Sequence, residues 1–369
     1  MGDRIYLSSP HMSDEGYEKE YIKEAFDTNW IAPLGANVTG FETEIAALLN
    51  VKAAAALSSG TAAIHMALKA AGVGKGDIVF CQSLTFAASC NPIIYQDAIP
   101  VSIDSDYETW NMDPKALEEA FKKYPNVKAV IVVHLYGLSA DLGKIINICK
   151  EHNVVLIEDA AESLGTTYKG KYTGTFGDYG IFSFNGNKII TTSGGGMIVS
   201  NNEERIQKVR FWSTQSRDKA RHYQHSELGY NYRMSNIVAG IGRGQLKVLD
   251  RRIEKKRYIF NYYKKELSDI KDITFMPIND WNEPNYWLSC ITLNGKVKPL
   301  DILLALEEEN IESRPIWKPM HLQPYYEKYD FIGNNISDNI FNNGLCLPSD
   351  TKMTDEDLNR VCEVIKRLW

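Results

Sequence analysis

The chain has 369 residues, 44% hydrophobic and 11% aromatic, so it can build a large apolar core and is neither disordered nor fibrous. Its 41 lysine and arginine residues and 47 aspartate and glutamate residues leave a net charge of −6 without a basic arm, which argues against nucleic-acid binding. No apolar run approaches the roughly 18 residues of a membrane span, no signal peptide is visible, and the scattered cysteines form no Cys-x-x-Cys metal motif. We expect a cytoplasmic protein with reduced thiols, no membrane contact and no metal site.

Two amphipathic segments near the N-terminus, 13–29 and 37–49, are expected to be helices that pack outside a sheet. From about 53 to 200, short apolar runs alternate with segments of helical period, which is typical of a mostly parallel sheet between helices. The expected strands are 53–57, 77–83, 98–104, 127–134, 154–159 and 179–184. Helices are expected from 60 to about 72, from 85 to 95, and from the Asp113-Pro114 cap onward.

After residue 201 the pattern becomes helical, and 235–270 holds one long periodic segment that becomes charged at 251–257. Charges of both signs on a long helix indicate a solvated face. We therefore place a domain boundary near residue 250. The chain is predicted to have a large domain at 1–250 and a smaller α+β domain at 251–369.

Ligands of open α/β sheets bind beyond the carboxyl ends of the strands, so the turns after strands are the candidate sites. Ser58-Ser59-Gly60-Thr61 offers N–H groups and hydroxyls at a helix start, which suits a phosphate, although a simply capped helix has the same sequence. Asp159 ends an apolar strand and needs a cation or hydrogen-bond donors, and a helix cap is the plainer reading. Lys188 follows a polar turn, where most lysines are solvated.

Together, a phosphate cradle, a buried aspartate and an amine are the parts that a pyridoxal phosphate enzyme needs. The chain also resembles the DegT/StrS-type pyridoxal phosphate aminotransferases that act on nucleotide sugars. The resemblance covers nearly the whole chain. It is carried by the ordered motifs NWIAPLG, SSGTAAIHMAL, SLTFAAS, IEDAAESLG, GTFGDYGIFSFNGNKIITTSGGGM, GYNYRMSN and RPIWKPMHLQPYY. It implies an aspartate-aminotransferase-like α/β fold, fold type I of these enzymes.

The resemblance implies a role for each matching residue. Lys188 would form the Schiff base with the cofactor and then act as general acid and base, and Asp159 would keep the pyridine nitrogen protonated. Phe86 would stack on the ring, although it could also be an ordinary core residue. The remaining cofactor contacts implied by the family are Gly60, Thr61 and Ser183 at the phosphate and Glu162 near the 3′ oxygen.

Three further residues concern the partner subunit and the substrate. The resemblance implies a homodimer with shared sites, in which Asn231 reaches the phosphate of the neighbouring subunit. His321 and Arg233 are candidates for the substrate pocket, although His321 could instead pack beside Trp317 and Pro319.

The run SFNGNKIITTSGGGM looks most like the 4-aminotransferases of the UDP-N,N′-diacetylbacillosamine pathway. These transfer the amino group of L-glutamate to a UDP-linked 4-keto-6-deoxy-N-acetylhexosamine. A dTDP- or GDP-linked 4-keto-6-deoxy sugar is the alternative acceptor. A non-catalytic sensor or scaffold remains a third reading, and the presence of Lys188 disfavours the family's dehydratase branch, where histidine replaces the lysine.

Overall fold

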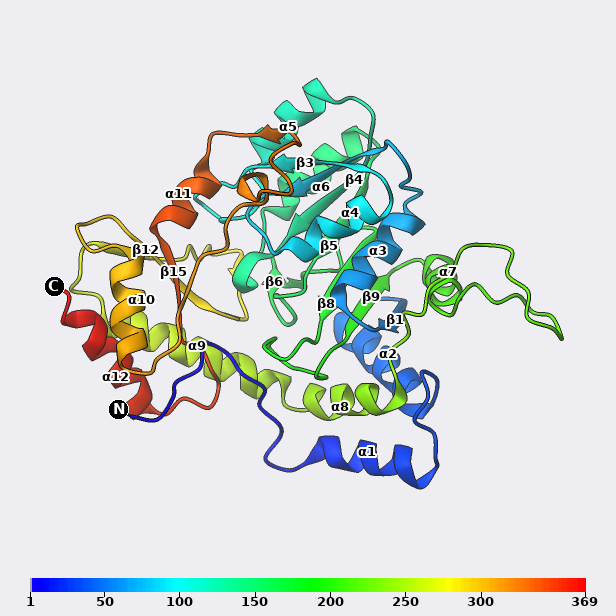
Figure 1. The fold of residues 1–369 in the computed structure, drawn as a ribbon, viewed down its shortest axis with the longest axis horizontal. Helices are drawn as coiled ribbons and strands as arrows, with labels where there is room; N and C mark the ends of the chain where they lie inside the picture. The colour runs from blue at the N-terminus through cyan, green and yellow to red at the C-terminus, as the bar shows by residue number, and fades with distance from the viewer. Residues whose placement is uncertain (1) are drawn as a thin grey trace.

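The computed structural model describes residues 2–369 and is built around one large, twisted sheet (Figure 1). Its strands follow the order β1-β9-β8-β5-β4-β2-β3-β14. Their bounds are β1 (Ala53–Leu57), β2 (Ile78–Gln82), β3 (Ile99–Ile103), β4 (Val127–Val133), β5 (Val155–Asp159), β8 (Tyr179–Ser183), β9 (Gly196–Ser200) and β14 (Phe331–Ile332).

Six neighbouring strands from β8 to β14 run parallel, and β9 runs antiparallel between β8 and β1. The turns after β1, β2, β5 and β8 therefore meet at one edge of the sheet, as the sequence predicts. The strands expected at 53–57, 77–83, 98–104, 127–134, 154–159 and 179–184 are confirmed to within about two residues at each end.

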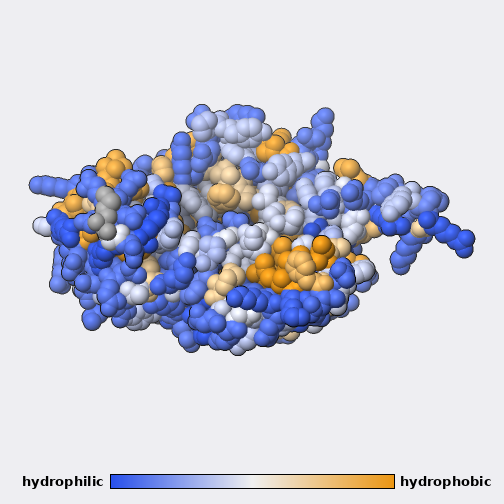
Figure 2. All heavy atoms as spheres, turned by 60° about the horizontal axis from the view of Figure 1, so that its bottom comes forward, coloured by the Kyte–Doolittle hydropathy of each residue, from blue (hydrophilic) through white to orange (hydrophobic). Residues whose placement is uncertain are grey.

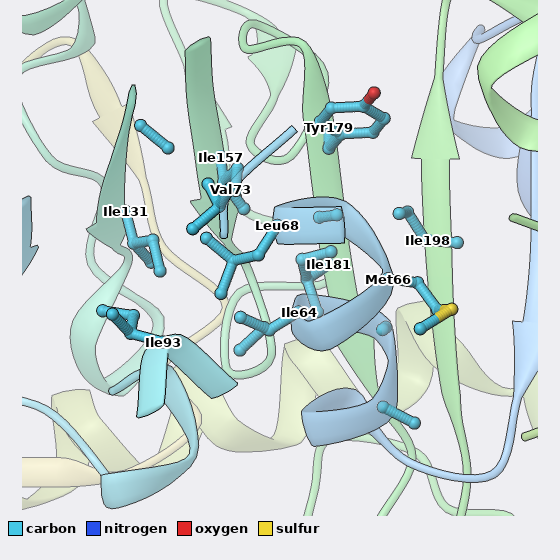
Figure 3. Close-up of a cluster of buried hydrophobic side chains, with 14 of the residues drawn as sticks. Ile64, Met66, Leu68, Val73, Ile93, Ile131, Ile157, Tyr179, Ile181 and Ile198 are labelled. Atoms are coloured by element: carbon cyan, nitrogen blue, oxygen red, sulfur yellow. The ribbon is translucent and has the colours of Figure 1, made fainter. Parts of the chain in front are cut away.

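Helices cover both faces of this sheet. On one face, α3 (Gly60–Ala70), α4 (Asn91–Tyr95) and α7 (Glu203–Ser213) pack against the strands. Figure 3 shows Ile64 and Leu68 of α3 directed at Ile157 and Ile181 of the central strands. The opposite face is covered by α2 (Ala36–Leu49), α5 (Pro114–Lys123) and α6 (Leu142–Glu151). Burial on both faces explains why the central strands lack apolar–polar alternation.

A smaller antiparallel sheet, β10-β12-β15-β13, lies in the C-terminal part of the chain. Its strands are β10 (Ile273–Phe275), β12 (Ser289–Leu293), β13 (Arg314–Pro315) and β15 (Gly344–Leu347). The helices of this part are α9 (Leu249–Glu266), α10 (Pro299–Glu308), α11 (Ile336–Asn343) and α12 (Asp355–Lys366). A large parallel sheet between helices with a smaller antiparallel sheet is the aspartate-aminotransferase-like fold, so the predicted fold class is confirmed.

The predicted boundary at residue 250 falls in the first turn of α9. Two segments cross it. Ile5 packs in the core of the small domain beside Ile311, and β14 adds to the edge of the large sheet beside β3. The division at residue 250 stays a prediction. The N-terminal segment contributes to both the large and the small domain.

The structure corrects two expected helices. The helix expected at 85–95 is divided into a 3-10 turn at Ala87–Ser89 and α4, because Pro92 suits only the first turn of a helix. The segment 235–270 is two helices, α8 (Asn236–Leu246) and α9, separated at Lys247 and Val248. The break lets α8 pack on α1 (Tyr17–Asp27) and α2, while α9 buries its apolar side in the small domain.

Three short strands, β11 (Asn282–Glu283), β6 (Thr167–Tyr168) and β7 (Lys171–Tyr172), form a third sheet.

Figure 2 shows the face below the large sheet, where an apolar patch stands among mostly polar side chains. Within residues 2–369, no helix is both long and apolar enough to cross a membrane.

Candidate active site

A cavity of about 370 Å³ lies where the turns after β1, β2, β5 and β8 meet. Seven of the residues singled out in the sequence line it, although they are far apart in the chain. They are Gly60, Thr61, Phe86, Asp159, Glu162, Ser183 and Lys188. The structure thus brings the predicted cofactor-binding set together, while its function stays a prediction at this point.

The N-terminus of α3 forms the wall of the cavity that suits an anion. The Ser59 hydroxyl accepts a hydrogen bond from the Ala62 N–H at 3.0 Å and caps the helix. Within residues 2–369, the N–H groups of Gly60 and Thr61 have no protein acceptor, so they are available to a ligand. The helix cap of the sequence analysis is therefore present, and the same turn offers available N–H groups where an anion is predicted to bind.

The turn at Ser59 and Gly60 depends on a glycine from another strand. Gly196 lies opposite Leu57 on β1 and Ser183 on β8. A Cβ at Gly196 would stand 2.3 Å from the backbone of Ser59 and 2.5 Å from the Gly60 nitrogen. Only glycine permits this approach, which brings the Ser183 side chain beside the α3 N-terminus.

Asp159 lies at the end of β5, 5% exposed, with its carboxylate on the cavity wall. Its Oδ2 accepts a hydrogen bond from the Ser89 hydroxyl at 2.6 Å, and its Oδ1 accepts one from the Ala161 N–H at 3.2 Å. Ser89 in turn is hydrogen bonded to Thr85 at 2.8 Å. This fixes the orientation of the carboxylate toward the cavity. Ser89 was not identified from the sequence, because a serine in a turn carries no signal of its own.

Lys188 projects into the cavity between a carboxylate and an indole ring. Its Nζ is 3.9 Å from Glu162 Oε1 and 4.1 Å from the centre of the Trp287 ring, and its side chain is 11% exposed. Burial lowers the pKa of Lys188, which favours the neutral, nucleophilic amine. Burial also raises the pKa of Glu162 to about 7, although the Lys188 charge opposes this shift.

Aromatic side chains complete the cavity. Phe86 is 57% exposed, which is unusual for a phenylalanine and argues against the ordinary core reading. Its ring lies 5.4 Å from that of Trp317. Trp287 and Trp317 also line the cavity but were not predicted to be site residues. Trp317 lies within the WKPMH motif, and nothing in the sequence around Trp287 distinguishes it from a core tryptophan.

The three remaining predicted residues lie outside this cavity. Asn231 is exposed, and Arg233 donates hydrogen bonds to Glu42 at 2.7 Å and to the Ala56 carbonyl at 2.9 Å. The His321 imidazole is held between the Ser83 hydroxyl at 2.7 Å and Asp338 at 3.0 Å. Their predicted contacts with a partner subunit or substrate stay predictions.

The chain was compared with known proteins. Residues 13–366 match the model of the DegT/DnrJ/EryC1/StrS aminotransferase family. The chain belongs to this family. It is therefore a pyridoxal phosphate-dependent enzyme of the nucleotide-sugar aminotransferase class.

Similar proteins cover 90% or more of the chain. EpsN of Bacillus subtilis (strain 168), which carries the provisional name of a pyridoxal phosphate-dependent aminotransferase, is 54% identical over 100% of this chain and 97% of its own. A GDP-perosamine synthase of Escherichia coli O157:H7 is 38% identical over 99% of each chain. A UDP-4-amino-4,6-dideoxy-N-acetyl-beta-L-altrosamine transaminase of Campylobacter jejuni (strain 81-176) is 33% identical over 90% of this chain and 92% of its own.

The fold is also shared with solved structures. A DegT DnrJ EryC1 StrS aminotransferase from Brucella abortus has a TM-score of 0.89 and 27% identity, and the match covers 96% of this chain and 95% of that one.

The cavity fits pyridoxal phosphate on its own chemistry. The available N–H groups of Gly60 and Thr61 suit the phosphate, the Asp159 carboxylate suits the pyridinium nitrogen, and the Lys188 amine suits the aldehyde carbon. Within residues 2–369, no cluster of three or more His, Cys, Asp or Glu side chains could hold a metal ion.

Proposed function

We propose that this enzyme transfers the amino group of L-glutamate to C4 of a nucleotide-linked 4-keto-6-deoxy sugar, and that its preferred acceptor is a UDP-linked sugar with a 2-acetamido group. The observation that supports the chemistry is the convergence of the Lys188 amine, the Asp159 carboxylate and the Gly60 turn on one cavity. The acceptor rests on the likeness of the SFNGNK run to bacillosamine-pathway enzymes. The product would serve the synthesis of a bacterial glycan or glycoprotein.

The residues of the chain divide the work of this reaction. Bound cofactor supplies an electron sink and carries the amino group between the two substrates. Gly60 and Thr61, with Ser183, hold its phosphate, and the Phe86 ring covers one face of the cofactor ring. Asp159 holds a proton on the ring nitrogen, which strengthens electron withdrawal. Glu162 lies on the same side as Lys188 and binds near the 3′ oxygen.

Lys188 acts in both halves of the reaction. Its amine, made neutral by burial, takes the proton from the α-carbon of glutamate. In the second half it delivers a proton to the carbon of the acceptor sugar that receives the amine. The aromatic walls formed by Trp287 and Trp317 exclude water from this position.

A GDP-linked 4-keto-6-deoxy sugar is the second candidate acceptor. Sequence identity supports this alternative. The GDP-perosamine synthases are up to 38% identical to this chain, whereas the transaminase of a UDP-linked N-acetyl sugar is 33% identical to it. A site built to bind an acetamido group leaves its own polar groups unpaired with a 2-hydroxyl, which can lower kcat/KM by about 10⁴-fold. The direct test is to supply L-glutamate with UDP-acetamido, GDP-hydroxyl and dTDP-hydroxyl 4-ketosugars and to compare kcat/KM. Equal rates, or preference for GDP, would contradict the UDP proposal.

We also propose a homodimer in which Asn231 binds the cofactor phosphate of the neighbouring subunit. The exposure of Asn231 and its position outside the cavity of its own chain support this arrangement. The apolar patch in Figure 2 is consistent with a subunit contact. A cytoplasmic location is proposed as well, supported by six cysteines that are all buried and free of disulfides.

A further inference from the structure

A buried lysine that does not line the cavity is hydrogen bonded to the backbone of Trp287 and has no part in the proposed chemistry. Lys256 on α9 is 2% exposed, and its Nζ donates hydrogen bonds to the Trp287 carbonyl at 2.9 Å, to the Ser8 hydroxyl at 3.1 Å and to the Ser349 carbonyl. Within residues 2–369, no carboxylate lies at ion-pair distance from it. Burial lowers the pKa of Lys256 to about 7.

These hydrogen bonds belong to a closed ring of hydrogen bonds formed by Lys256, Ser8, Asn187 and Trp287. It includes the peptide bond between Asn187 and Lys188. The Asn187 carbonyl, which belongs to that peptide bond, accepts from the Ser8 hydroxyl at 3.0 Å and from the Trp287 indole N–H at 2.7 Å. Lys256 binds both of these donor residues. The ring therefore runs from Lys256 through Ser8 to Asn187, and returns through Trp287.

Both sides of the ring act on the Lys188 side chain. The Asn187 carbonyl sets where the Lys188 backbone enters the cavity, and the Trp287 ring lies 4.1 Å from the Lys188 Nζ. A buried lysine without an ion-pair partner costs stability that methionine would not, although the Asp350 charge opposes part of the effect of burial on the Lys256 pKa. Its hydrogen bonds to three separate segments indicate that position, rather than packing, is what it provides.

We propose that Lys256 is a positioning residue for Lys188, which acts through Ser8, Asn187 and Trp287. The ring joins the N-terminal segment, the Lys188 turn and the small domain, because Ser349 also donates its N–H to the Leu7 carbonyl at 2.7 Å. Placement of the Lys188 amine then depends on the contact of the two domains. This inference rests on the proposed role of Lys188.

The test measures Lys188 without cofactor. Apoenzyme is given a short pulse of an amine-reactive ester, and the rate of labelling at each lysine is read by mass spectrometry. In Lys256→Met and in Ser8→Ala, we expect labelling of Lys188 to rise about fivefold, the population change that the loss of one hydrogen bond produces. Ser8→Ala keeps the test decisive if Lys256→Met does not fold, since Ser8 is only half-buried.

Tyr263→Phe is the matched control. Tyr263 is buried on the same helix and donates a hydrogen bond to the Pro348 carbonyl at 2.8 Å, next to Ser349 but outside the ring. It should lower thermal stability without changing Lys188 labelling. Lys256→Arg keeps the charge and the hydrogen-bond donors, so its rate of Lys188 labelling should lie between those of Lys256→Met and the wild type.

The holoenzyme gives a second readout. Both ring variants should slow the glutamate half-reaction about tenfold, because small misplacements of a reacting group are costly. Unchanged Lys188 labelling in Ser8→Ala and Lys256→Met, or an equal rise in Tyr263→Phe, would overturn the positioning role. Because labelling uses apoenzyme, this result is independent of whether any nucleotide sugar is aminated.

Discussion

The proposed site residues inside the cavity and those outside it are positioned in different ways. Gly60, Asp159 and Lys188 stand at the ends of strands of one sheet and meet in one cavity of a single chain. Asn231, Arg233 and His321 lie outside that cavity, and two of them are already held by carboxylates of their own chain. Parallel strands bring the first group together by topology alone. The second group would be completed only by loops and by a partner subunit in the dimer that we propose.

The largest effect is expected at the amine. Lys188→Ala should slow the glutamate half-reaction at least about a thousandfold, because acid–base and covalent roles are lost together. The fold should remain, since the side chain makes no structural hydrogen bond that the core requires. Stopped-flow absorbance with glutamate measures the rate, and circular dichroism checks the fold. Turnover within tenfold of wild type would show that another residue supplies the reactive amine.

The next largest effect distinguishes Asp159, which lines the cavity, from the adjacent residue Glu158, which does not. Asp159→Asn should keep cofactor binding but slow the half-reaction about a hundredfold. Glu158 is the matched control: it points away from the cavity and accepts hydrogen bonds from His134 and from backbone N–H groups at 174, 176 and 177. Glu158→Gln should reduce stability by about 1–3 kcal/mol and leave the rate of the folded enzyme unchanged. Similar rates in the two variants would make Asp159 a helix cap only.

A glycine substitution tests the anion-binding turn. Gly196→Ala places a Cβ 2.3 Å from the Ser59 backbone, whereas Gly60→Ala brings one only to 3.2 Å from the Ser183 Cβ. Overpacking costs about 1–3 kcal/mol, so Gly196→Ala should weaken cofactor binding about tenfold or more. Equilibrium titration with pyridoxal phosphate measures this. Gly60→Ala should have the smaller effect, and the reverse order would show that the turn adjusts freely.

Mixed dimers test the residues that a partner subunit would supply. An Asn231→Ala chain and a Lys188→Ala chain should each have low activity, and a mixed dimer should recover part of it, because one of its sites carries both changes and the other neither. Activity after the two chains are unfolded and refolded together is compared with that of each alone. No recovery, or a fully active monomer at low concentration, would contradict the shared site.

The remaining effect concerns pH and apoenzyme stability rather than turnover. Burial raises the pKa of Glu162 from 4.5 to about 7, so its protonated form favours the folded state. This contribution is fully present below pH 4.5 and is lost as pH rises to about 7, by up to about 3 kcal/mol. Glu162→Gln should remove that loss and flatten the stability curve between these values, as denaturant unfolding at several pH values would show. An unchanged slope would place the titration on another group.

The contrast also shows what the sequence could predict. Strand ends are visible as apolar runs followed by polar residues, so Asp159, Lys188 and the Gly60 turn could be found. Ser89 and Trp287 could not, because each acts through a hydrogen bond to a residue about 70 or 100 positions away. The Arg233 side chain forms an ion pair with Glu42, which the sequence did not indicate, and its predicted contact with substrate stays a prediction.

The most direct test of the account concerns Lys188. Holoenzyme is reduced with borohydride, digested and mapped by mass spectrometry, with unreduced enzyme as the control. The account predicts that the pyridoxyl label is found on Lys188, in the peptide that contains SFNGNK, and that prior addition of L-glutamate removes it. A label on Lys256 or on any other lysine, or one that glutamate does not displace, would contradict the proposed site.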